Sequence, residues 1–224
     1  EAVLVGLDCV VGFTDEQKSA LAGFVKTIQA HELLLVVNTR DVNGAVIDFS
    51  RGPSDEPAPI VDRAAALAHV SALLDEGLAD LQAAGDEFPF GLSTGFSGFD
   101  TPETFQQFNR ALKARVEVYR GNYADALTAL ASSFLVLDPT QLDLGVYHTF
   151  GTGPGAGQNE LHAPGDAPDI LAHPSIVADA ERRTNGDVDL RVQRKIPTLP
   201  ETRTVRSITT GVAFDIYEDL STPI

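Results

Sequence analysis

The stretch RALKARVEVYRGNYADALTALASSFLVLDP, residues 110–139, has the pattern of two helices joined by a tight turn. Apolar residues recur at helical spacing on both sides of Gly121-Asn122, where we expect one helix to end and the next to begin. Glycine adopts the left-handed backbone that ends a helix, and the Asn122 side chain can accept a hydrogen bond from the free N–H groups that begin one. The stretch therefore predicts a helical hairpin.

Small side chains decide how closely the two predicted helices approach. Alanine occupies four positions of the hairpin where a larger residue would hold the helices apart, namely Ala111, Ala114, Ala126 and Ala129. The sequence GNYADAL followed by LDP is similar to the turn, second helix and closing proline of a tetratricopeptide repeat. A solenoid needs several such repeats, and one good copy is present, so a plain antiparallel helix pair inside a larger helical domain is the alternative.

Composition limits the class of protein. The chain has 224 residues, 43% of them hydrophobic, which is enough for one sizeable core. A formal net charge of −16 repels polyanions, so we expect no nucleic-acid partner. A single cysteine, Cys9, excludes an internal disulfide and a multi-cysteine metal site, and we expect a buried, inert thiol. The longest apolar run, residues 33–37, is too short to cross a bilayer and is expected to end an amphipathic helix.

Periodicity and capping residues predict three helices before the Gly121-Asn122 turn, the third of which is the first helix of the hairpin. The first is expected over residues 15–37 with Thr14 or Asp15 as its cap, and the second over 62–84. The third opens at Thr101, with Pro102 in its first turn. We therefore predict a mainly α fold with a helical scaffold over 1–138. Residues 139–224 are expected to form a loop-rich segment with short extended runs, packed on the scaffold as part of the same domain.

Several segments together resemble the SusD/RagB family. They are ALAGFVKTIQAHELLLVVNTRDVNGAVID, LLDEGLADL, FPFGLSTGFSGFDTPETFQQFNRALKARVEVYRGNYADALTAL, and HPSIVADAE followed by DLR. The resemblance runs from about residue 19 to residue 191 and lies in the order of the segments, not in any single motif. Members of this family are nutrient-binding lipoproteins of the bacterial outer membrane, built on tetratricopeptide-like helical hairpins that carry long loops.

The resemblance implies a SusD-like fold and a binding function without cofactors or catalysis. The protein would capture a glycan or similar nutrient at the cell-surface face of the outer membrane and pass it to a TonB-dependent transporter. Family members are longer than this chain, which resembles their middle part. We therefore expect the remaining parts of a longer precursor, or other subunits of an assembly, to cover an apolar patch on the long helices.

Two groups of residues are candidates for ligand binding. Asn38, Arg40 and Asp41 follow the first predicted helix and offer hydrogen-bond donors and acceptors, although Arg40 and Asp41 can instead pair with each other or cap the helix. The second group, before a glycine-rich loop, presents rings suited to sugar faces, although packing on the helical body is the equal alternative. Its members are Tyr147, His148 and Phe150.

Metal and catalytic motifs are weak in this sequence. The possible metal ligands His148, Glu160, His162, Asp166 and His173 lack the tight spacing of a metal signature, so we predict no metal site. The run GTGPGAG at 151–157 lacks the lysine of a phosphate-binding loop, and G-x-S-x-G does not occur. The acid pairs at 75–76 and 86–87 are expected on or near a solvated helix face.

Two other functional classes remain open. With no Trp and four Tyr the chain has few rings for a glycan platform, which favours a helical scaffold or structural subunit in a larger assembly, with no ligand of its own. A glycan hydrolase acting through paired carboxylates is the third hypothesis.

Overall fold

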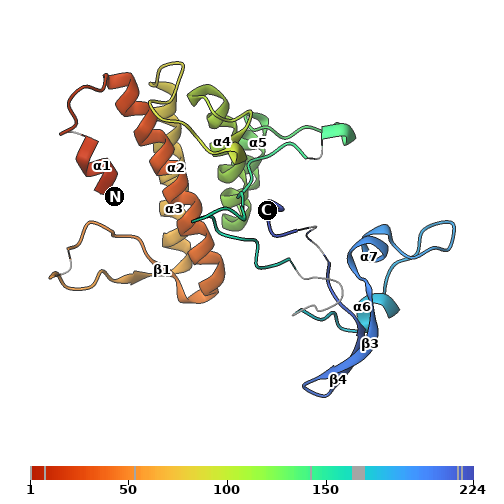
Figure 1. Ribbon diagram of the computed structural model, residues 1–224. Coiled ribbons are helices and arrows are strands. Elements are labelled where there is room, and N and C mark those ends of the chain that lie inside the picture. Colours follow the sequence, from red (N-terminus) through yellow and green to blue (C-terminus); the bar gives the residue numbers. More distant parts are fainter. Residues whose placement is uncertain are drawn as a thin grey trace. The chain divides into compact units, whose positions relative to one another are not determined.

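The computed structural model describes residues 2–7, 9–52, 54–141, 143–162, 170–215, 217 and 219–224 (Figure 1). Helices account for 47% of these residues, which confirms a mainly helical chain. The chain divides into two compact units, Glu1–Val146 and Tyr147–Ile224. The helices and strands are α1 (Ala2–Leu7), α2 (Asp15–Arg40), β1 (Ala45–Val46), β2 (Ile60–Val61), α3 (Arg63–Gln82), α4 (Pro102–Arg120), α5 (Tyr123–Ala131), α6 (Ser175–Ala178), α7 (Leu190–Lys195), β3 (Thr198–Val205) and β4 (Ile208–Val212).

Helices α2 to α5 are the main helices of the first unit, and each packs on the next along the chain (Figure 1). The predicted helix starts are confirmed. Thr14 and Gln17 form a capping box at α2, and Asp62 accepts a hydrogen bond from the Ala65 N–H at α3. Thr101 caps α4, with Pro102 as its first residue. Polar side chains that satisfy free N–H groups therefore set the start of each long helix.

The hairpin of α4 and α5 is confirmed, and Gly121 ends α4 in the left-handed conformation with φ of +78°. Ala114, Ala126 and Ala129 are buried. The predicted capping role of Asn122 is wrong: its side chain makes no cap hydrogen bond, and its Nδ2 instead donates to Glu117 Oε2 at 2.8 Å. A buried carboxylate is a stronger acceptor than solvent, which explains why the amide turns back toward α4.

The apolar run at the end of α2 is amphipathic, as predicted. Leu33, Leu34 and Val37 are buried with residues of α3, α4 and β1, while Leu35 and Val36 are exposed. By length and composition alone, Asp15–Asn43 would suffice to cross a membrane. In this unit the helix contributes its apolar stripe to a packed core, as helices of globular proteins do.

Two glycines allow α2 and α3 to cross with their backbones nearly in contact. A Cβ on Gly23 would lie 2.6 Å from Leu81 Cγ and 2.9 Å from the Gly77 carbonyl oxygen. Beside this crossing, the Asn109 side chain of α4 donates to Thr27 Oγ1 at 2.8 Å and to the carbonyl oxygen of Leu74 at 3.1 Å. Asn109 thus hydrogen-bonds α4 to both crossing helices, and the sequence patterns did not predict this contact.

The glycine-rich segment before α4 completes the core with aromatic rings. Phe88 and Phe96 contact Phe24 of α2, and both also contact Phe105 of α4. Because these rings lie 5.6–6.1 Å apart, centroid to centroid, they form one aromatic cluster at the end of the helices. Much of the small aromatic supply of the chain is therefore used for packing.

The prediction that Cys9 is buried is wrong, because the thiol is exposed. Cys9 lies in a turn that follows α1, with its N–H donating to the Gly6 carbonyl at 3.0 Å. The short helix α1 buries only Leu7 among its residues, so the turn that follows it has no core to enter.

The second unit contains the predicted extended tail. Strands β3 and β4 pair antiparallel with Val205 opposite Ile208, and Arg206-Ser207 forms the turn with positive φ at both residues. Strand β4 ends at Val212, and the next residue, Ala213, is buried. That residues 139–224 pack on the scaffold as one domain stays a prediction.

Candidate functional site

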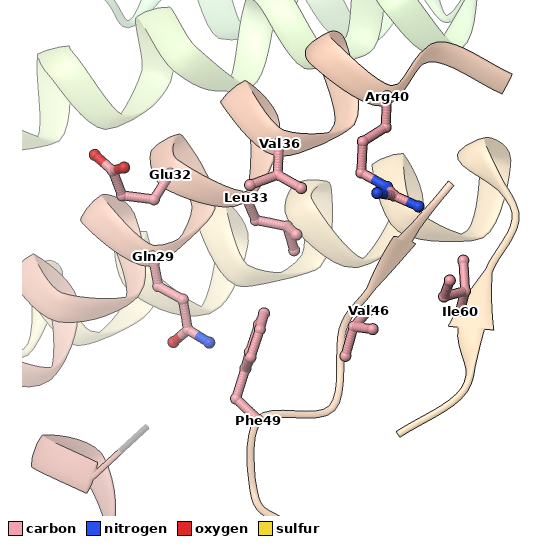
Figure 2. A pocket seen from close by; sticks show the side chains of 8 residues that line it. All are labelled: Gln29, Glu32, Leu33, Val36, Arg40, Val46, Phe49 and Ile60. Carbon is pink, nitrogen blue, oxygen red and sulfur yellow. The ribbon is translucent and has the colours of Figure 1, made fainter. Parts of the chain in front are cut away.

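The first unit contains a pocket of about 640 Å³ between α2 and the β1–β2 ribbon, which we name the α2–β1 pocket (Figure 2). Its lining residues are Gln29, Glu32, Leu33, Val36, Arg40, Val46, Phe49 and Ile60. Those from α2 recur every three or four residues, so they form one stripe along the helix. The others come from β1, β2 and the loop between them, which face this stripe.

A tight turn at Gly44 fixes the second wall of the pocket. Gly44 has φ of +66°, and a Cβ there would overlap the Val61 carbonyl oxygen, so only glycine fits. The turn returns the chain along α2, where Val46 pairs with Ile60 in the ribbon. The two strands therefore hold Val46 and Ile60 opposite the end of α2.

Arg40 supplies the positive charge of the pocket. Its Nε donates to the Gly44 carbonyl oxygen at 2.8 Å, which fixes the guanidinium against the turn. Figure 2 shows the side chain pointing from α2 toward the ribbon. Among the described residues, its two terminal nitrogens have no hydrogen-bond partner. A fixed guanidinium with free terminal N–H groups is suited to bind an anion or a carbonyl oxygen.

An aromatic ring and an amide complete the pocket. Phe49 is 47% exposed, and Figure 2 shows its ring pointing toward α2. The Oε1 atom of Gln29 is buried and accepts no hydrogen bond within the part of the chain that the structure describes. Glu32 is exposed, and its carboxylate lies 3.3 Å from His31 Nδ1. The pocket therefore offers an apolar surface with separate polar groups, an arrangement typical of small-molecule binding.

Of the first predicted group, only Arg40 lines this pocket. Arg40 bonds to the Gly44 carbonyl, and the backbone N–H of Asp41 donates to the Val37 carbonyl at the end of α2. Asn38 is exposed on the last turn of α2. The backbone of Asp41 thus caps the helix, while the Arg40 side chain binds the Gly44 turn and lines the pocket.

The second predicted group, Tyr147, His148 and Phe150, belongs to the second unit and does not line the α2–β1 pocket. The His148 ring meets the Phe150 ring edge to face, with centroids 4.7 Å apart, and the His148 backbone pairs with that of Ile224. Phe150 and Tyr147 are half-buried. His148 is exposed, while Phe150 is partly packed within its own unit.

Two of the possible metal ligands make separate local contacts. His162 Nδ1 lies 2.9 Å from the Tyr217 carbonyl oxygen, and His173 Nδ1 lies 2.8 Å from Ser175 Oγ. Asp166 lies outside the described residues. Within the ranges that the structure describes, no three His, Cys, Asp or Glu residues are grouped to hold a metal ion.

A second pocket, of about 590 Å³, lies among α3, α4 and α5 and is lined by charged residues. At its base the Glu117 carboxylate, 1% exposed, accepts hydrogen bonds from Ser71 Oγ at 2.6 Å and Arg120 Nη1 at 2.8 Å. Lys113 Nζ lies 3.2 Å from the same carboxylate and 2.6 Å from Asp75. We call these five residues, with Arg110 and Asn122, the α3–α5 ion-pair network.

Burial alone would raise the pKa of Glu117, and it is the largest single influence. Hydrogen bonds from Ser71, Asn122 and Lys113, with the charge of Lys113, together outweigh it and lower the pKa to about 2. Two carboxylates hold the Lys113 ammonium, so it acts as an ion-pair partner and not as a base for Ser71. The network joins α3 to α4 and to Asn122 in the turn before α5, and it offers no activated nucleophile.

The acid pair Asp75-Glu76 lies on a solvated face, as predicted, but it also makes contacts that were not predicted. Asp75 and Glu76 are on a solvated face, since their side chains are more than half exposed. The prediction missed that Asp75 also binds Arg110 at 3.0 Å and Lys113 at 2.6 Å. The i, i+3, i+7 spacing of residues 110, 113 and 117 on α4 is the sequence signal that could have shown a charged face.

Comparisons with known protein families, with characterised proteins and with solved structures find no match to this chain. The α2–β1 pocket and its chemistry therefore carry the functional conclusion.

Proposed function

We propose that this protein is the ligand-binding component of a nutrient-uptake system of the SusD/RagB kind. It captures an oligosaccharide or similar small ligand at the cell-surface face of the bacterial outer membrane and hands it to a TonB-dependent transporter. The observation that carries the proposal is the α2–β1 pocket, where the exposed Phe49 ring lies in one cavity with the Arg40 guanidinium and the Gln29 amide. A small nutrient with both apolar and polar surface fits this mixture, because C–H faces pack on rings while hydroxyls and other polar groups require donors and acceptors.

The arrangement of the helices supports the same proposal. Helices α2 to α5 are sequential neighbours, and α4 and α5 are joined by a tight glycine turn, as in tetratricopeptide-like hairpins. We assign the SusD-like description on this arrangement together with the order of segments in the sequence. In such a protein the hairpins hold the loops that meet ligand and transporter, and here the loop between α2 and α3 carries Phe49.

Calorimetry and thermal-shift measurements with a panel of oligosaccharides test the proposal. We expect at least one oligosaccharide to bind, and Phe49→Ala to abolish that binding because the ring platform is lost. The matched control is Phe13→Ala, which removes an exposed ring that does not line the pocket. Silence across the panel contradicts capture of an oligosaccharide, and release of cleaved products would favour the hydrolase hypothesis instead.

A structural subunit is the second candidate, because one face of α5 is apolar and exposed. Tyr123 is 67% exposed and Leu127 is 68% exposed, and their i, i+4 spacing places them side by side on the helix. Exposed apolar neighbours of this size are typical of surfaces that another chain covers. Light scattering, together with a dye that reports apolar surface, tests this candidate. A compact monomer that does not bind the dye would contradict it.

A further inference from the structure

The lining of the α2–β1 pocket is mainly apolar. Five of its eight residues are aliphatic or aromatic, namely Leu33, Val36, Val46, Phe49 and Ile60. A sugar unit carries hydroxyls around its edge, and a wall of this kind would leave most of them without partners on binding. The pocket therefore suits a ligand whose body is mostly apolar more closely than it suits a free, fully hydroxylated sugar.

The charge of the pocket is concentrated at one end. Arg40 is the one cation among the described residues that line it, and its terminal nitrogens are free while its Nε is held by the Gly44 carbonyl. The planar, pre-oriented fork of a guanidinium fits a carboxylate in a bidentate manner. The end of the pocket near Arg40 is thus ready for an anionic head group.

The opposite end discourages a second negative charge. Glu32 lies eight residues before Arg40 on the same helix, which is about 12 Å along the axis at the rise of an α-helix. Near it, Gln29 Oε1 is buried without a donor, so a hydroxyl or amide N–H on the ligand would satisfy it. The site is therefore complementary to one anionic group at the Arg40 end, with an apolar body and a neutral donor beyond it.

We propose that the α2–β1 pocket binds an amphipathic monocarboxylate, with the carboxylate on the Arg40 guanidinium and an aryl or alkyl body against Val36 and Phe49. This inference rests on the proposed function, since it takes the pocket as the site of nutrient capture, and it names the chemical class of the ligand. Electrostatic attraction to Arg40 supplies selection for the anion, and the apolar wall supplies most of the buried contact area.

Calorimetry with 4-phenylbutyrate and its neutral analogue 4-phenylbutyramide tests the inference on the intact chain. We expect the carboxylate to bind about tenfold more tightly than the amide, the difference that about 1.4 kcal/mol produces. Arg40→Gln should remove this preference by weakening the carboxylate and leaving the amide unchanged. Because Arg40→Gln also loses the bond to Gly44, Arg40→Lys is the second variant, and it should keep a reduced preference for the anion.

The control variant is Arg115→Gln, which removes an exposed arginine of α4 outside the pocket and should leave both affinities unchanged. Equal binding of carboxylate and amide by the unmodified chain would overturn the inference, as would a preference that survives Arg40→Gln. Oligosaccharide binding without 4-phenylbutyrate binding would refute the monocarboxylate and leave the proposed function standing. If neither class of ligand binds, both proposals are refuted.

Discussion

Replacing Glu117 by Gln tests whether the α3–α5 ion-pair network stabilises the fold. The substitution keeps the volume and removes the charge of a carboxylate that is 1% exposed. In the native chain this carboxylate accepts hydrogen bonds from Ser71, Arg120 and Asn122, and it lies 3.2 Å from the Lys113 ammonium. The glutamine amide cannot pair with either cation as an ion, so both lose an anionic partner.

Two routes give a similar magnitude for the loss. Lowering the pKa from 4.5 to about 2 corresponds to about 3 kcal/mol favouring the charged form in the folded state, since a factor of ten is worth about 1.4 kcal/mol. Removing one partner from a buried ion pair costs about 3–5 kcal/mol in other proteins. Because Asp75 remains to hold Lys113, we expect the lower end, about 3 kcal/mol.

Urea unfolding followed by circular dichroism measures this difference. The folded-state pKa of Glu117 is depressed, so its stabilisation is complete above pH 4.5 and is lost as the pH falls toward 2. The unmodified chain and Glu117→Gln should therefore differ at pH 7 and converge near pH 2. Asp125→Asn, which changes an exposed acid lining the same pocket, is the control. Stability of Glu117→Gln within about 0.5 kcal/mol of the unmodified chain at pH 7 would refute the reasoning.

Further predictions concern the helix contacts and use the same unfolding assay. Gly23→Ala should destabilise by about 1–3 kcal/mol, because its Cβ would overlap Leu81 and the Gly77 carbonyl, whereas Gly6→Ala, with open space around it, should not. Ala126→Leu should cost about 1–3 kcal/mol by overpacking the hairpin, while the exposed Ala124→Leu should be nearly neutral. Gly121→Val should cost about 1–2 kcal/mol, since a branched residue resists φ of +78°. An unchanged unfolding midpoint for Gly23→Ala, Ala126→Leu or Gly121→Val would contradict the structural reason given for that variant.

Local signals were enough to predict the long helices and the hairpin. Thr14, Asp62 and Thr101 act within three residues of their partners, and Gly121 acts through its own backbone angle, so all four can be read from sequence. Gly23 and Gly77 show the limit of this reading. Within a single helix a glycine lowers the stability of that helix. The close approach that these two glycines allow exists only when the second helix lies against the first.

The candidate site was predicted only in part for the same reason. Arg40 stands out as a polar residue at a helix end, but its pocket also needs Phe49 and Ile60, which the Gly44 turn and the β1–β2 pairing bring back to α2. Strands of two residues carry too little periodicity to reveal such pairing. The prediction that Cys9 is buried was wrong for a similar reason, because the exposure of its thiol depends on what α1 packs against and not on its neighbours in sequence.

Mapping of ligand binding by backbone amide NMR tests the central claim most directly. The ¹H–¹⁵N spectrum of the chain would be recorded during titration with 4-phenylbutyrate and, separately, with an oligosaccharide that binds in the panel. We predict that the largest shift changes fall on the α2–β1 pocket and its turn, at Val36, Arg40, Gly44, Val46 and Phe49. Shift changes confined to residues outside this pocket, or no changes at saturating ligand, would contradict the account.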